Sequence, residues 1–446
     1  MAAQGSEQQQ TRGGWRFLLR ALGHRNYRLF FAGQSVSLIG TWLTRVATSW
    51  LVYRLSGSAM LLGVIGFCGQ IPTFVLAPVA GVLVDRWNRH RLLVVTQVLA
   101  MLQSFALAVL ALTGVITVWQ IALLNVVQGL INAFDMPARQ AFVVEMVDDR
   151  ADLPNAIALN STMFNGARLL GPSVAGALIA FVGEGGCFLI DGFSYLAVIV
   201  SLLAMRVALR QREQKRQHVL TELKEGFHYA FSFPPIRALL GMLALVSLMG
   251  MPFTVLMPVM ASEILHGGPN TLGFLMAASG MGALCGALFL ASRRTVRGFG
   301  GVIVAMASLF GVGLVAFSAS RNVALSLVTM VVCGFGMMVT TAASNTVLQT
   351  IVEERMRGRL MSFYSMAFMG TAPFGSLLAG VLATHVGAPV TIAIGGGACL
   401  VGAALLRWKL PALREHVRPI YVRLGILPEV ASGMQSEANR TGAAEN

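Results

Sequence analysis

The chain has 446 residues, of which 56% are hydrophobic and only 12% are charged. Because soluble globular proteins carry about 25% charged residues, this composition excludes a set of soluble domains and favours a protein with many membrane spans. The formal net charge of +14 does not require a nucleic-acid partner, since the cytoplasmic loops of membrane proteins collect arginine and lysine.

In chain order, a polar tail over residues 1–24 is followed by apolar segments that are long enough to cross a bilayer. About 20 apolar residues span a hydrocarbon core that is roughly 30 Å thick. The apolarity is continuous, which favours helices over the alternation of a β-barrel. The sequence therefore predicts an all-α membrane protein with 12 transmembrane helices, at 28–53, 59–84, 92–114, 117–138, 156–181, 186–206, 237–262, 271–292, 300–319, 323–350, 362–384 and 387–408.

The distribution of basic residues predicts the orientation of these spans. If the N-terminus lies inside, the outer loops hold only Arg54 and Arg321 of the 33 Arg and Lys residues. Since cytoplasmic loops are the ones enriched in basic residues, we expect both termini to be cytoplasmic. The strong preference for arginine over lysine favours a bacterial source, and hence a multi-pass protein of a bacterial inner (plasma) membrane.

The longest cytoplasmic connection, at 207–236, divides the spans into two groups of six. Within it, Leu220, Leu223, Phe227 and Phe231 recur at helical spacing. This pattern predicts a short amphipathic helix on the inner leaflet, with a solvated linker helix as the alternative. The predicted organisation is a tail, a six-helix bundle, the linker, a second six-helix bundle and a second tail, at 1–24, 25–206, 207–236, 237–409 and 410–446.

The two halves carry similar short stretches at matching places. Gln140-Ala-Phe-Val and Gln349-Thr-Ile-Val each lie at the junction of the fourth and fifth span of their half. This favours a unit of six spans that is repeated in parallel, an arrangement found in several transporter folds.

The loop after the second predicted span reads Gly81-Val-Leu-Val-Asp85-Arg86-Trp-Asn-Arg89-His-Arg91. Its glycine allows helices to approach closely, and its carboxylate lies among guanidinium groups with which it can form a switchable ion cluster. The loop resembles the signature loop of the major facilitator superfamily, Gly-x-Leu-x-Asp-Arg-x-x-Arg, at the cytoplasmic position which that family uses. The resemblance implies a cytoplasmic gate motif made of Gly81, Asp85, Arg86 and Arg89.

Further stretches resemble the branch of this superfamily that groups with the bacterial enterobactin exporter. The resemblance runs from about residue 20 to residue 410. It implies a rocker-switch transporter of two pseudo-symmetric bundles, with a substrate site between them that spans one, four, seven and ten line. The stretches are Gly40-Thr-Trp with Ser49-Trp-Leu-Val-Tyr53, Asp135-Met-Pro-Ala-Arg-Gln140, Gly267-Gly268 with Thr271-Leu-Gly273, and Arg357-Gly-Arg-Leu-Met-Ser362.

Polar residues follow helical spacing in spans one and four, so each set shares one helix face. A polar stripe is costly in lipid and should face a cavity or another helix. Interhelical hydrogen bonds would use the same residue types, so both interpretations stay open. The candidates for the substrate cavity are Gln34, Ser37, Thr41, Thr44, Asn125, Gln128, Asn132, Arg168 and Asn345.

Charged residues inside the spans are few and therefore informative. Asp135 and Arg139 lie four residues apart and can pair on one helix face; they are the first candidates for proton coupling, although a purely structural pair would look the same. Asp191 and Arg45 lie at roughly matching depths and form the second candidate pair.

Two positions depart from the drug–proton antiporters of the superfamily. Many of these carry an arginine three residues before Gln-Gly in span four, where this chain has Asn125. Their glycine-rich motif in span five is only partly matched by Gly171-Pro172-Ser-Val-Ala175-Gly176. The resemblance therefore does not carry over the usual arginine-based proton relay.

The sequence contains no phosphate-binding loop, His-Glu-x-x-His motif or Cys-x-x-Cys pair, so it predicts no enzyme, no cofactor and no metal site. We expect a monomeric secondary transporter that exports an amphipathic small molecule, such as a siderophore or a drug, in exchange for protons. The alternatives are a facilitator or importer of a polar metabolite, a lysolipid flippase, and a membrane receptor on the same fold. The expected partners are the small molecule, protons and the lipid bilayer, without nucleic acid.

Overall fold

The described part of the molecule is helical. The computed structural model describes residues 19–206, 229–293 and 295–426, and these ranges contain no strand. Ten of their helical segments are long and apolar enough to cross a membrane. One of these holds two of the predicted spans, which meet at Gly183 (φ 70°), and the helix Arg25–Ser56 covers the first predicted span, where polar residues lower the mean hydropathy. The helices predicted from the sequence are thus all found in the described ranges.

The first six spans form one bundle, called here the N-domain. Polar caps begin several of its helices: the side chains of Ser58 and Asn88 accept backbone N–H bonds, and Thr117 forms a capping box with Gln120. Its elements are η1 (Arg20–Gly23), α2 (Arg25–Ser56), α3 (Ala59–Arg86), α4 (Arg89–Leu112), α5 (Val118–Met146), η2 (Arg150–Asp152) and α6 (Leu153–Leu203).

The remaining spans form the C-domain, and two of them are interrupted. The span predicted at 237–262 contains two π-helical turns, with Pro252 and Pro258 unable to donate backbone hydrogen bonds. The span predicted at 362–384 is divided at Gly370. The elements are α8 (Pro234–Leu245), η3 (Val246–Gly250), α9 (Phe253–Val259), η4 (Met260–Ile264), α10 (Pro269–Ala291), α11 (Phe299–Ala319), α12 (Val323–Ile351), η5 (Glu354–Met356), α13 (Arg357–Met369), α14 (Ala372–Val386) and α15 (Ala388–Arg423).

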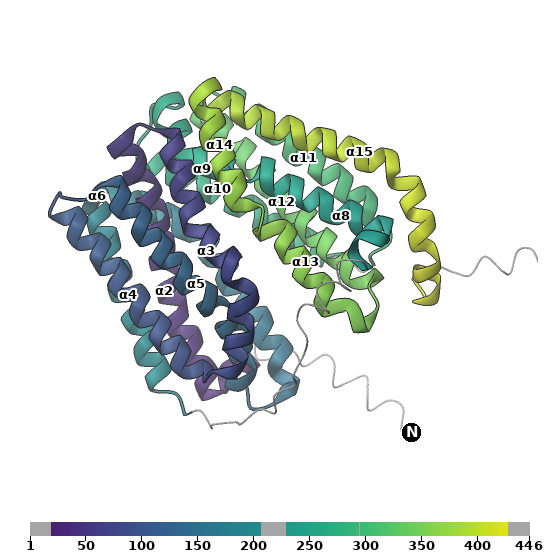
Figure 1. The fold of residues 1–446 in the computed structure, drawn as a ribbon, viewed down its shortest axis with the longest axis horizontal. Helices are drawn as coiled ribbons and strands as arrows, with labels where there is room; N and C mark the ends of the chain where they lie inside the picture. Colours follow the sequence, from purple (N-terminus) through teal and green to yellow (C-terminus); the bar gives the residue numbers. More distant parts are fainter. Residues whose placement is uncertain (1–18, 207–228, 294, 427–446) are drawn as a thin grey trace, which may run out of the picture.

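The two domains lie side by side in Figure 1, with α3 against α14 and α6 against α10. We call the end that carries the α3–α4 turn at Arg86–Arg89 and the start of α13 the basic end, and the other end the opposite end. In Figure 1 the basic end is at the bottom, and the ribbons of the two domains diverge toward it.

Glycines bring the domains into backbone contact near the opposite end. A Cβ added to Gly63 of α3 would lie 2.9 Å from the Cα of Gly380 of α14. A Cβ added to Gly176 of α6 would lie 3.1 Å from the Cα of Gly273 of α10. The first distance is shorter than real Cβ contacts, and the Cβ at Gly176 would also lie 2.7 Å from the Pro269 carbonyl oxygen, so glycine is required wherever the helices stay this close.

The contacts between the domains continue to about the middle of the molecule. There Phe74 of α3 meets Phe374 of α14, with 6.1 Å between their ring centroids. Closer to the basic end, Val79 and Met369 are each 53% exposed. The molecule is therefore closed at the opposite end, and its two domains diverge toward the basic end.

Both ends of the described chain extend the predicted bundles. Residues 20–24, placed in the N-terminal tail by the sequence, pack against the N-domain, where the Ala21 N–H donates to Asn155 Oδ1 at 2.9 Å. At the other end, α15 continues beyond residue 409 to Arg423. Most of the amphipathic helix predicted within 207–236, at Leu220 to Phe227, lies outside the described residues.

Candidate functional site

Asp135 lies in the interior of the N-domain, where α5 faces α4. Its side chain accepts hydrogen bonds from Thr96 Oγ1 at 2.9 Å and Gln97 Nε2 at 2.8 Å, and it forms an ion pair with Arg139 one turn along α5. The residue is 4% exposed. The predicted pairing of Asp135 with Arg139 is therefore present, but the carboxylate is directed toward α4 rather than into space between the domains.

Asp191 of α6 is bound by hydroxyl groups alone. Thr44 Oγ1 donates to its Oδ2 at 2.6 Å and Ser104 Oγ at 3.0 Å, while Ser194 Oγ donates to its Oδ1 at 3.3 Å. Among the described residues no cation is paired with this carboxylate, so the pairing with Arg45 considered from the sequence does not occur in this conformation. The carboxylate is instead bonded by hydroxyls, and the Arg45 side chain lies against Trp42.

The Arg45 side chain turns to a different neighbour. Its Cζ lies 5.1 Å from the ring centroid of Trp42, a cation–π arrangement. Trp42 packs on α6, since a Cβ added to Gly171 would lie 2.5 Å from the Trp42 Cβ. Arg168 is one turn before Gly171 and is close enough to Arg45 for their charges to repel.

Neither of these two arginines is paired with an acidic residue in the described part of the chain. The side chain of Arg45 is exposed, although much of the protein lies around it at longer range. Arg168 is half-buried. Two uncompensated guanidinium groups at this depth are costly unless water or an anion reaches them.

Much of the polar stripe of span one is used for packing. Gln34 and Ser37 are 2% and 1% exposed, and Thr41 donates to the Ser37 carbonyl at 3.0 Å. A Cβ at Gly33 would lie 2.5 Å from Ser201 Oγ of α6, which shows how closely this face meets that helix. In this conformation Gln34 and Ser37 are buried and Thr44 bonds to Asp191, and their place in a cavity lining stays a prediction.

The stripe of span four is less deeply buried. Asn125, Gln128 and Asn132 are all half-buried. Gln128 Nε2 donates to Asn132 Oδ1 at 3.1 Å, while Gln128 Oε1 is buried without a partner among the described residues. An unmatched buried acceptor is costly, so Gln128 Oε1 has the capacity for one more donor.

The gate motif is partly described. Arg89 is 6% exposed, and its Nη1 donates to Glu145 Oε1 at 2.8 Å, which ties α4 to α5. Arg86 is exposed, and a Cβ added to Gly81 would meet nothing within 4 Å, so this glycine is not at a close helix contact in the present conformation. The Asp85 side chain lies outside the described part, and its predicted contact stays a prediction.

The C-domain candidate, Asn345 of α12, takes part in local bonds. Its Oδ1 accepts from Gln349 Nε2 at 2.6 Å, and it also bonds to Tyr364 of α13.

A contact that sequence reasoning missed connects the domains: the Tyr53 hydroxyl donates to Glu263 Oε1 at the opposite end. Only the charge of Glu263 beside a predicted span could have drawn attention to it.

The family model described as "Transmembrane secretion effector" matches residues 19–423. The chain belongs to this family of the major facilitator superfamily. The staphyloferrin A transporter of Staphylococcus aureus is 23% identical over 370 residues, which are 83% of this chain and 92% of that protein. The multidrug efflux pump Tap of Mycolicibacterium fortuitum is 27% identical over 389 residues, 84% of this chain and 93% of that protein.

Solved structures show the same fold. An inward-facing, unoccupied bacterial homologue of the human lysosomal transporter Spinster superposes with a TM-score of 0.66 at 13% identity, covering 92% of this chain and 99% of that one. The predicted superfamily and fold are therefore confirmed. This secretion effector is a multi-pass membrane transporter of small molecules, and its family and structural neighbours are transporters rather than enzymes.

Proposed function

We propose that this secretion effector exports an amphipathic small molecule from the cytoplasm in exchange for protons, by alternating access. The observation that carries the proposal is the arrangement of the domains, which meet at glycines near the opposite end and diverge toward the basic end. Relatives that transport a siderophore and efflux several drugs support small-molecule export. A monomer is sufficient, since both halves of the site come from one chain.

The basic end is proposed to face the cytoplasm, because arginine and lysine collect there. In that orientation the present conformation is open to the cytoplasm, ready to take up cargo for export. A reporter enzyme that is active only in the periplasm, fused after residue 426, is expected to be inactive. An active fusion would reverse the orientation and with it the direction of transport.

Asp135 and Arg139 are the proposed coupling pair. Protonation of Asp135 would remove its attraction to Arg139, and the freed guanidinium would need another partner. The ion pair is intact in the conformation that is open at the basic end, as expected if the proton has already left toward that side. Asp191 is the competing carboxylate, and its donors among the described residues are hydroxyl groups.

The test uses purified protein in liposomes with an imposed pH gradient, and staphyloferrin A among a panel of anionic and cationic cargoes. Asp135→Asn should abolish gradient-driven export while retaining counterflow without a gradient. Asp149→Asn is the control, because Asp149 is exposed on the η2 turn. Full gradient-driven export by Asp135→Asn would assign coupling to Asp191 instead, with Asp191→Asn as the next variant.

Arg45 and Arg168 define the proposed chemistry of the cargo. Two guanidinium groups without acidic partners in the described residues favour an anionic group on the transported molecule, because such pairs bind carboxylates strongly. Trp42 beside Arg45 offers an apolar surface to the rest of an amphipathic molecule. Arg45→Gln should weaken transport of anionic cargo more than that of cationic cargo; equal losses for both would remove this role.

A further inference from the structure

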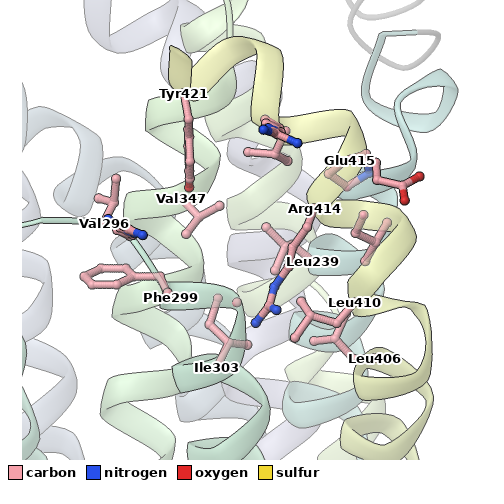
Figure 2. Close-up of a pocket in the computed structure, with 17 residues that line it drawn as sticks. Leu239, Val296, Phe299, Ile303, Val347, Leu406, Leu410, Arg414, Glu415 and Tyr421 are labelled. Carbon is pink, nitrogen blue, oxygen red and sulfur yellow. The ribbon is translucent and has the colours of Figure 1, made fainter. Parts of the chain in front are cut away.

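A cavity of about 450 Å³ lies at the basic end of the C-domain, away from the interface of the two domains. Figure 2 shows it between α11 and α12 on one side and α15 on the other. Leu239, Ile303 and Leu406 form part of its apolar wall, with Val347 and Leu410 beside them. A volume in this range fits a small organic ligand or part of a lipid.

Three arginines belong to the lining of this cavity. Arg297, Arg414 and Arg418 line it, and none of the three is in an ion pair with a described residue. Figure 2 shows the Arg414 side chain extending into the cavity, while the Glu415 carboxylate, the acidic group among the lining residues, points away from it. The cavity thus combines apolar walls with positive charge that no described acidic residue pairs, and Arg414 carries part of this charge into the cavity.

The position of α15 places this cavity near the membrane surface. The helix has 36 residues, so it is about 54 Å long and exceeds a hydrocarbon core of roughly 30 Å. Trp408 of this helix is 76% exposed. Tryptophan is enriched at membrane–water interfaces, so we place Trp408 at that level. Beyond it, Val417 and Tyr421 pack on the C-domain, so the end of α15 is amphipathic.

We propose that this cavity binds an anionic phospholipid from the leaflet at the basic end. The phosphate would contact the lining arginines, Arg414 among them, since basic pockets between helices at this level suit anionic headgroups. An acyl chain would occupy the apolar interior, which a free phosphate ion would leave empty. The site does not depend on the cargo or on proton coupling, because it lies within one domain.

The experiment measures lipid binding to the full chain in detergent. The probes are dioleoylphosphatidylglycerol, dioleoylphosphatidylcholine and inorganic phosphate, and the readouts are lipid retained in native mass spectra and the shift of the unfolding temperature. Phosphatidylglycerol is expected to bind and to stabilise the protein more than either other probe. The double variant Arg414→Gln, Arg418→Gln should weaken its binding at least tenfold.

Two further variants separate this site from the general lipid belt. Arg407→Gln is the matched control, because Arg407 is exposed on the same helix and does not line the cavity. Leu410→Trp should reduce phosphatidylglycerol binding by filling the cavity without removing charge. Equal phosphatidylglycerol binding in all variants would overturn the proposal, and so would equal stabilisation by inorganic phosphate, which would show that no acyl chain is needed.

Discussion

Substituting Gly273 with alanine tests whether the glycine contact between α6 and α10 holds the opposite end closed. A Cβ at this position would lie 2.5 Å from the Pro172 carbonyl oxygen and 3.0 Å from the Gly176 Cα. Both neighbours are backbone atoms, so no side-chain rotation can relieve the overlap. Reaching an ordinary contact of 3.4 Å requires the two helices to move apart by about 0.9 Å.

Overpacking of this kind costs about 1–3 kcal/mol. The cost applies only to the conformation in which the two helices are in contact. The equilibrium should therefore shift toward the conformation that is open at the opposite end, by about 5- to 150-fold in the population ratio. The native cysteines are first replaced, and single cysteines are then introduced at Trp119 and Arg321, which are both exposed at that end. Spin labels attached to them report the distance between the domains. The population at long distance should rise.

Gly397→Ala is the control for this experiment. An added Cβ at Gly397 of α15 would meet nothing within 4 Å, and alanine is the better helix former. Its distance distribution should match that of the unmodified protein. An unchanged distribution in Gly273→Ala would refute the reasoning, because the contact would then not restrain the domains.

Three other predictions concern polar contacts. Tyr53→Phe removes the hydrogen bond to Glu263; since a bond to a charged group contributes about 1.5–3 kcal/mol, the same spin labels should report more of the open form. Gly40→Ala places a Cβ 2.5 Å from Asp191 Oδ1 and should lower the unfolding temperature; an unchanged unfolding temperature would contradict this. Burial lowers the pKa of His24, but Asp152 and Asp148 raise it more, so its pKa lies above 6.5. The docking of η1 should therefore be strongest below about pH 6.5 and loosen as the pH rises through the folded pKa of His24. Hydrogen exchange over residues 20–24 measures this docking. A His24→Gln variant with the same pH dependence would contradict the prediction.

The spans and the family could be predicted because the bilayer imposes simple rules on the sequence. A helix that crosses lipid must be apolar over about 20 residues, and the gate motif around Asp85 has a characteristic pattern. Interruptions inside spans were not predictable in this way. The π turns on either side of Pro252 and the break at Gly370 leave apolarity unchanged, and they depend on what neighbouring helices supply to the freed backbone groups.

The candidate site was predicted by residue type but only partly by role. Helical spacing shows that polar residues share a face, yet it does not show which neighbour that face meets. Thus the pairing of Asp135 with Arg139 follows from their separation of four residues, whereas the contact of Asp135 with Thr96 and Gln97 of α4 does not. Likewise, the hydroxyls around Asp191 come from three different helices, and no local pattern could have assembled them.

The pairs Gly63–Gly380 and Gly176–Gly273 also bear on the speed of switching. At these two places the domains meet as smooth backbone surfaces, without side chains of one domain inserted between those of the other. Separating such surfaces requires no side chain to change its rotamer, and no side chain of one helix has to leave a space between side chains of the other. The activation barrier at these contacts should then be low, and bulkier residues would slow each cycle even if a compensating change restored the balance between the two states.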